Sequence, residues 1–237
     1  LASLSEKEIA NLFDNLKEKY GRDIFGQGYI YKIIDDSELA NVDELTKDEK
    51  ENGIDTSKNF YVPYDKGDKD GNRWYLETPF AIAWSKENVQ FLKTDPRARY
   101  QGYTFYFREG FCWIDSTYLK ARLKGNGVFD VLSMSLFSMN QIPDWYYVSL
   151  INSELISLYV DNFVNNTSHF QINDARQLPI VIPNLKILNK IEQLCKEAIC
   201  LKKDSFSSLV DRTTAEEKLL ALQRDLDYYV QAELYGI

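Results

Sequence analysis

Residues 97–108, RARYQGYTFYFR, combine three arginines and a glutamine with interleaved aromatic residues. Arginine can form two parallel hydrogen bonds with guanine and glutamine can do so with adenine, while lysine and tyrosine steady phosphates. The alternative is a β-hairpin whose exposed face is basic and whose aromatic side chains belong to the core. With a basic group after the next expected strand, the candidates for contacting nucleic acid are Arg97, Arg99, Gln101, Arg108, Lys120, Arg122 and Lys124.

Motifs that would indicate catalysis are missing from the sequence. The single histidine, His169, allows neither a His-based metal cluster nor a paired-His site. There is no G-x-S-x-G, no phosphate loop, no glycine fingerprint for a dinucleotide or S-adenosylmethionine, and no [DN]-P-P-[YF] tetrapeptide. The acidic and lysine residues at 48–50 and 217–218 fall in expected helices or loops, not on the adjacent strands of a nuclease. We therefore predict no catalytic residue and no metal site.

The charge of the chain is unevenly distributed. The net charge is −8, and acidic residues are concentrated in the first 60 residues, whereas basic residues outnumber acidic ones within 86–124. A local basic patch can bind DNA phosphates even in a chain of negative net charge, when a fused partner supplies most of the phosphate contacts. The charge therefore argues against strong autonomous DNA binding and not against base reading.

Cysteine usage and hydropathy indicate a cytoplasmic protein. The three cysteines have no metal-type spacing, and Cys195 and Cys200 lie in an apolar helical pattern, which favours core packing. No apolar run reaches the length of a membrane span and no leader pattern opens the chain. Because it starts LASLSEKEIANLF, without methionine, we expect it to be part of a longer polypeptide.

Hydrophobic periodicity places β-rich segments between helical ends. In the expected helix at 4–19, Ser5 is the N-cap and Glu8 stands at the third helical position. Residues 35–58 are polar and acidic, which indicates a solvated loop with a short helical piece. Strands are expected within 20–34, 60–84, 102–115, 128–139 and 179–183, and a short helix at 86–93.

Two longer helical patterns follow. Pro143 opens an expected helix over 143–163, which carries a wide apolar stripe. From 184 onward apolar residues recur at three- and four-residue steps, which predicts two antiparallel helices joined near 205–212, the second ending at Gly236 as a C-cap. The whole pattern favours an α+β fold.

Several segments resemble the C-terminal specificity region of Eco57I-like (type IIG) restriction-modification enzymes. They are FYVPYDKGDKDGNRWY (60–75), RYQGYTFYFREGFCWIDSTYLKARL (99–123), INSELISLYVDNFVNNTSHFQINDARQLPIVIP (151–183) and DLDYYVQAELYGI (225–237). The third segment is also similar to type I restriction specificity subunits, and the ending is similar to their I-D-x-x-V-x-x-L-Y-G-L tail. The departures are Asn166, which stands where those subunits often have glycine, and the single recognition domain in place of two.

The resemblance implies an α/β target recognition domain with a twisted β-sheet at 1–183, including a leading helix at 1–19, and a helical spacer hairpin at 184–237. It implies double-stranded DNA as a partner, together with the methyltransferase domain, and possibly a nuclease domain, of the parent chain. The parent would use S-adenosylmethionine, and Mg²⁺ if it cleaves, with no cofactor in this part. Beyond the DNA-facing set above, a second contact turn would comprise Asn166, Thr167 and Ser168, and a third Lys66, Lys69, Asn72 and Arg73.

Other functions remain open at this point. The chain is alternatively the recognition region of a nuclease-free phage-exclusion methyltransferase, a free-standing specificity subunit, or a protein-docking module that touches no DNA. A continuous basic concave face around 97–124 would favour DNA, whereas scattered charges would favour docking. An independent hydrolase is disfavoured because the nucleophile and base pairs are absent.

Overall fold

The structure, a computed structural model, places helices and mainly antiparallel strands in an α+β fold, which confirms the predicted class. The strands of the described residues form two sheets. The description covers residues 31–237 except 69–70, 97, 99, 115–118, 140 and 166–168, together with residues 5, 7–8, 11–12 and 14–15.

The chain divides into two compact units that interleave along the sequence. The helical hairpin belongs to the same unit as the second sheet. Unit 1 comprises Leu1–Asp70, Glu77–Phe107 and Asn126–Asp130, and unit 2 comprises Gly71–Leu76, Arg108–Gly125 and Val131–Ile237.

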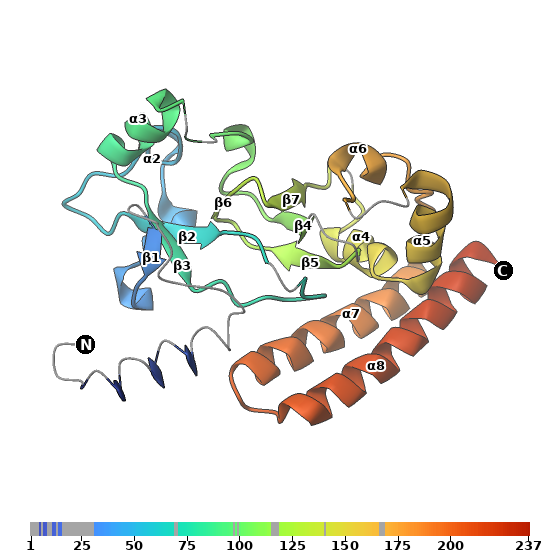
Figure 1. The fold of residues 1–237 in the computed structure, drawn as a ribbon. Coiled ribbons are helices and arrows are strands. Elements are labelled where there is room, and N and C mark those ends of the chain that lie inside the picture. Colours follow the sequence, from blue (N-terminus) through green and yellow to red (C-terminus); the bar gives the residue numbers. More distant parts are fainter. Residues whose placement is uncertain are drawn as a thin grey trace. The chain divides into compact units, whose positions relative to one another are not determined.

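Unit 1 is built on a four-stranded sheet with the order β1-β3-β2-β6 (Figure 1). The first three strands pair antiparallel, and β6 pairs parallel to β2. The predicted acidic segment at 35–58 forms two 3₁₀ turns and one short helix, and the predicted helix at 86–93 is confirmed as α3. The elements are β1 (Tyr31–Ile33), η1 (Asp36–Glu38), η2 (Val42–Glu44), α2 (Lys47–Asn52), β2 (Tyr61–Asp65), β3 (Phe80–Ala83), α3 (Lys86–Thr94), η3 (Tyr103–Phe105) and β6 (Val128–Phe129).

Side-chain caps fix the helix starts in unit 1. Ser5 and Glu8 form the predicted reciprocal capping bonds: Ser5 N donates to Glu8 Oε2 at 2.8 Å, and Glu8 N donates to Ser5 Oγ at 3.4 Å. Thr46 and Glu49 form the same arrangement at α2, and Ser85 caps α3. The core of the unit lies around Trp84, which is fully buried, with Ile54, Val62, Ile82, Val89 and Val128.

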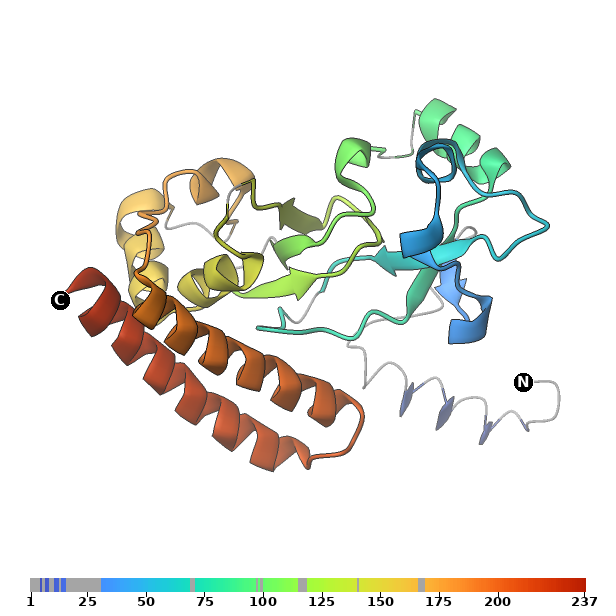
Figure 2. The ribbon, with the colours of Figure 1, turned by 180° about the vertical axis from the view of Figure 1, so that it is seen from behind.

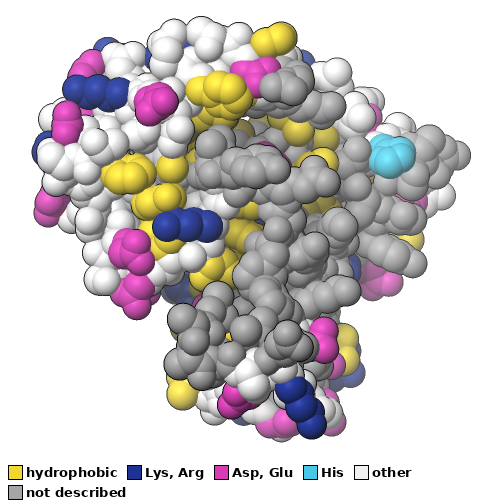
Figure 3. All heavy atoms as spheres, turned by 60° about the vertical axis from the view of Figure 1, so that its left-hand side comes forward, with side chains coloured by type: hydrophobic (Ala, Val, Ile, Leu, Met, Phe, Trp, Pro, Cys, Tyr) yellow, Lys and Arg dark blue, Asp and Glu magenta, His cyan; other side chains and the backbone are white. Residues whose placement is uncertain are grey.

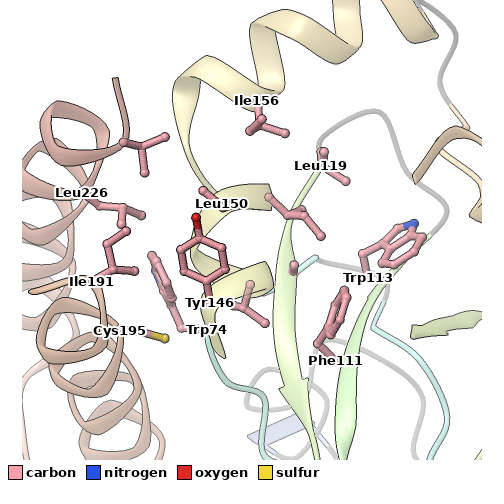
Figure 4. Close-up of a cluster of buried hydrophobic side chains, with 14 of the residues drawn as sticks. Trp74, Phe111, Trp113, Leu119, Tyr146, Leu150, Ile156, Ile191, Cys195 and Leu226 are labelled. Atoms are coloured by element: carbon pink, nitrogen blue, oxygen red, sulfur yellow. The ribbon is translucent and has the colours of Figure 1, made fainter. Parts of the chain in front are cut away.

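Unit 2 is built on an antiparallel three-stranded sheet with the order β5-β4-β7 and on helices that cover it. Figure 4 shows α4 between the sheet and the two long helices, with Tyr146 and Leu150 between Phe111 on one side and Ile191 and Leu226 on the other. The elements are β4 (Gly110–Ile114), β5 (Ala121–Lys124), β7 (Ser133–Leu136), α4 (Asp144–Ile151), α5 (Glu154–Tyr159), the π-helical η4 (Val160–Val164), α6 (Ile172–Ala175), α7 (Leu185–Phe206), α8 (Arg212–Tyr228) and the π-helical η5 (Tyr229–Tyr235).

The predicted helical hairpin is confirmed. Figure 2 shows α7 and α8 antiparallel and side by side, and Gly236 ends the second helix with a left-handed φ of 72°. The hairpin packs on unit 2, because Ile191, Cys195 and Leu226 are fully buried in the same hydrophobic cluster as α4.

The prediction of a single helix over 143–163 is wrong, because the helix is interrupted at Asn152 and Ser153, between α4 and α5. The Asn152 side chain donates to Ala121 O (2.9 Å) and accepts from Ala121 N (2.8 Å), as a neighbouring strand would do. Ser153 then accepts from Ile156 N and caps α5. Pro143 stands at the N-cap of α4, where the helix was predicted to open.

The strand predicted at 179–183 is wrong, and the strand predicted within 102–115 is confirmed in part. In the described part of 102–115 the strand covers Gly110–Ile114, and the preceding residues do not extend it, because Gly102 adopts a left-handed φ of 74° and starts a 3₁₀ turn. Residues 179–183 form no strand; instead Ile180 N donates to the carbonyl oxygen of the nearby Leu178 at 2.9 Å. Of the strand or hairpin predicted at 20–34, the described part forms β1.

Candidate functional site

The predicted DNA-facing residues are dispersed over the two units. Gln101 is exposed in unit 1, Arg108 is exposed in unit 2, and Lys120 is half-buried just before β5 in unit 2. Arg108 lies with its guanidinium carbon 5.5 Å from the Phe137 ring centre, and its Nη2 is 3.7 Å from Met139 Sδ. The predictions for Arg97, Arg99, Asn166, Thr167, Ser168 and Lys69 lie outside the described residues.

Arg122 and Lys124, which are among the predicted DNA-facing residues, are buried in the structure, each with 4% of its surface exposed. Lys124 Nζ donates to the carbonyl oxygens of Arg108 (3.4 Å) and Gly125 (3.1 Å), and it lies 5.5 Å from the Phe137 ring centre. Arg122, on β5, pairs with Trp74 in an isolated parallel β-bridge. Both cations lie inside unit 2 because residues 71–76 and β4 flank this strand on either side.

The third predicted contact loop is engaged in contacts within the units. In unit 1, Lys66 Nζ contacts the Tyr31 hydroxyl and lies 4.0 Å from the centre of that ring. In unit 2, Asn72 Oδ1 accepts from Lys202 Nζ (3.2 Å), and Arg73 Nη1 donates to Gln223 Oε1 (3.2 Å). Burial lowers the pKa of Arg73, opposed by the charge of Asp227. Asn72 and Arg73 therefore fasten the loop to α7 and α8.

Residues 100–107 of unit 1, named here the aromatic loop, carry several exposed planar side chains. Gln101 is exposed, Tyr103 has 57% of its surface exposed and Phe105 has 39%. The left-handed Gly102 starts the 3₁₀ turn that carries both rings, and a Cβ there would lie 3.3 Å from the Phe129 ring. Glycine at 102 thus permits the turn to lie close to the unit 1 core.

The base of the aromatic loop is anchored on Trp84. The Phe107 and Tyr106 rings meet the indole edge to face, at centroid distances of 5.4 and 5.8 Å. Phe107 holds a positive φ of 61°, and its amide donates to Gly127 O at 3.2 Å. Tyr106 donates to Gln101 O at 3.3 Å, and burial raises the pKa of the Tyr106 hydroxyl. These contacts give the loop a fixed support.

The rings of Trp84, Tyr100 and Tyr103 stack in series from the core to the surface, and this series is called the ladder. Tyr100 stacks on the buried Trp84 at 6.4 Å and 23°, and Tyr103 stacks on Tyr100 at 5.3 Å and 6°. Burial raises the pKa of Tyr100, and the neighbouring Tyr103 and Glu51 add to this rise. The sequence prediction did not include Tyr100 and Tyr103 as site residues, although their interleaving with Arg and Gln was the available signal.

Figure 3 shows how charged side chains are distributed on one face of the molecule. On the face drawn in Figure 3, the described lysines and arginines are interspersed with aspartates and glutamates. Because Arg122 and Lys124 are buried, Lys120 is the one cation within 119–124 that is partly exposed. The described residues therefore do not show the continuous basic face that would favour DNA over docking.

The described residues hold neither a metal-ligand cluster nor a membrane-crossing helix. No three His, Cys, Asp or Glu side chains among them come together as metal ligands would. None of the helices in this part of the chain combines the length and apolar character that a membrane crossing requires. His169 is exposed, and its carbonyl oxygen accepts from Asn165 Nδ2 at 2.9 Å.

A comparison with known proteins gives no matching family model and no curated protein that matches the chain.

Proposed function

We propose that this chain is the DNA-sequence recognition region of a restriction-modification enzyme of the Eco57I-like type. The observation that carries the proposal is the aromatic loop, which presents an exposed Gln101 and an exposed Tyr103 on a support fixed by Trp84. A glutamine amide can form two hydrogen bonds with adenine, and base reading needs such side chains on rigid supports. The resemblance of residues 60–75, 99–123 and 225–237 to that enzyme type supports the same function.

The division of labour in this proposal follows from the charge. The chain carries a net charge of −8, and phosphate attraction provides most of the non-specific affinity of a DNA-binding protein. The methyltransferase domain of the parent enzyme therefore supplies most phosphate contacts, and this chain supplies sequence discrimination. The exposed Arg108 contributes one phosphate or guanine contact from unit 2. S-adenosylmethionine, and Mg²⁺ if the parent cleaves, act in the other domains.

Duplex binding at low salt tests this function. The 237-residue chain is titrated into fluorescein-labelled DNA of mixed sequence while anisotropy is followed, and the titration is repeated at several salt concentrations. We expect weak binding that falls as salt rises, and Arg108→Ala is expected to weaken it and to reduce the salt slope by about one. Gln101→Ala is expected to lower discrimination between sequences by about 1–3 kcal/mol and to leave the salt slope unchanged.

Arg224→Ala is the matched control, because Arg224 is also exposed but lies on α8. It removes the same charge without touching the proposed contacts and should bind DNA as the unaltered chain does. Binding that Arg108→Ala and Arg224→Ala weaken equally would count against a specific contact at Arg108. Failure to bind any duplex at low salt would count against DNA recognition by this chain and favour the second candidate.

A protein-docking module is the second candidate, favoured by apolar side chains left in solvent around the hairpin. Large exposed fractions are found for Ile182 (78%), Leu185 (76%), Leu209 (76%) and Leu220 (63%). Exposed apolar side chains of this kind occur at protein interfaces, and the mixed surface charge is compatible with one. Docking without DNA binding would leave all three variants and the unaltered chain equally inert in the anisotropy titration.

A further inference from the structure

In the part of the chain that the structure describes, the Tyr103 ring is stacked on one face, by Tyr100, and no further ring of the ladder lies on the other face. One face stacks on Tyr100 at 5.3 Å with an interplanar angle of 6°, yet 57% of the residue surface remains exposed. The ladder therefore ends in an open planar surface, and the buried end of the ladder is Trp84.

Contacts of the neighbouring residues fix the orientation of the Tyr103 ring. Gly102 sets the left-handed turn from which the Tyr103 ring projects, and the Gly102 backbone lies close to the Phe129 ring. Tyr100 meets both Trp84 and Tyr106, so the ring beneath Tyr103 has contacts on two sides. A ring with a fixed orientation loses little conformational freedom when a ligand stacks on it.

We infer that Tyr103 is a stacking platform for an unpaired nucleobase, with Gln101 placed beside it to hydrogen-bond the edge of that base. Aromatic side chains bind bases through their planar faces, and this contact is tolerant of base identity. A base inside an intact duplex has both faces covered by its neighbours, so a base offers a face to Tyr103 only after it leaves the stack, which is easiest for an unpaired base. The inference deepens the proposed function and rests on it.

Core packing alone does not account for this arrangement. A ring that served the core would be buried as Trp84 is, whereas Tyr103 leaves most of its surface in water. Tyr228 provides a comparison within the chain, because it is exposed to a similar extent (61%) but meets Tyr229 at 84° and continues no parallel stack. Tyr228 is therefore a matched control for the loss of an exposed tyrosine.

The test uses the 237-residue chain and 2-aminopurine, a fluorescent base whose emission changes on stacking. One duplex carries 2-aminopurine opposite an abasic site, and a second carries it paired with thymine. We expect binding to quench the unpaired probe, and Tyr103→Ala to remove the quenching and weaken binding of that duplex by about tenfold. Tyr103→Phe keeps the ring and Tyr228→Ala leaves the loop intact, so both should behave as the unaltered chain.

The remaining outcomes each overturn the inference. Equal weakening of both duplexes by Tyr103→Ala would mean that Tyr103 contacts the DNA backbone and not a base. If Tyr103→Ala has no effect but Arg108→Ala still weakens duplex binding, the platform is wrong and the recognition function stands. If neither duplex binds, both proposals fail, and binding of a proline-rich peptide that depends on Tyr103 would assign the ring to protein docking. Circular dichroism of each variant verifies that it is folded.

Discussion

Burial decides the chemistry of single side chains in this protein, and the three cysteines show this directly. Cys112 and Cys195 are buried, while Cys200 is exposed on the same helix as Cys195. Cys195 lies in the unit 2 core, where burial raises the pKa of its thiol to about 11. The thiolate is the nucleophile, so a raised pKa and a lack of solvent access both suppress its reactions.

Alkylation should therefore separate the three thiols. With N-ethylmaleimide at pH 8 we expect Cys200 to be modified first, and Cys112 and Cys195 to be modified only after urea is added. Peptide mass spectrometry measures the extent at each site over time. Cys200→Ser should remove the fast phase, and alkylation of Cys195 at a rate similar to that of Cys200 in the folded chain would contradict the buried position of its thiol.

At the scale of elements, close backbone approaches fix how strands and turns meet. β6 pairs parallel to β2, and Gly127 precedes β6 at the point where the two segments come together. A Cβ at Gly127 would lie 2.4 Å from the carbonyl oxygen of Pro63, which is much closer than real Cβ contacts. Gly127 O also accepts from the Phe107 amide at the base of the aromatic loop.

Gly127→Ala is accordingly expected to destabilise the chain by about 1–3 kcal/mol, because the added methyl group must displace β2 or β6. Urea unfolding followed by circular dichroism measures the change. Gly125→Ala is the control, since nothing lies within 4 Å of a Cβ at that position, and its effect should stay within about 0.5 kcal/mol. Equal effects of the two substitutions would argue against the close pairing of β2 with β6.

At the scale of the whole molecule, each unit has its own hydrophobic cluster. The unit 1 cluster surrounds Trp84, and the unit 2 cluster joins the sheet, α4 and the helical hairpin. Leu226 of α8 is fully buried in the second cluster, whereas Leu220 of the same helix has 63% of its surface exposed. The hairpin is therefore part of the unit 2 core along its buried face.

Leu226→Ala should cost about 2–5 kcal/mol, since the removed atoms leave a cavity in a packed core. In hydrogen exchange with mass spectrometry, we expect faster exchange in peptides of unit 2, including α4, α7 and α8, ahead of any change in unit 1. Leu220→Ala should leave exchange unchanged. Faster exchange confined to α8 would show instead that the hairpin opens without the rest of unit 2.

The sequence by itself determined the local elements whose signals lie within a few residues. The 3.6-residue periodicity marked α7 and α8, the Ser5 and Glu8 spacing marked a capped helix start, and Gly236 marked the end of the hairpin. These signals need no partner from elsewhere in the chain, because the periodicity, the capping bonds and the left-handed glycine act within one or two helical turns.

Only the tertiary structure decided which polar and aromatic side chains reach solvent. Asn152 breaks a helix by bonding to Ala121, Arg122 and Lys124 are buried on β5, and Tyr103 is exposed at the end of a ring ladder. Residue type and spacing within 97–124 predicted side chains suited to nucleic-acid contacts, but they did not predict which of these side chains are accessible to solvent. Accessibility depends on contacts between residues distant in the sequence, such as Trp74 beside Arg122, and local patterns do not encode these contacts.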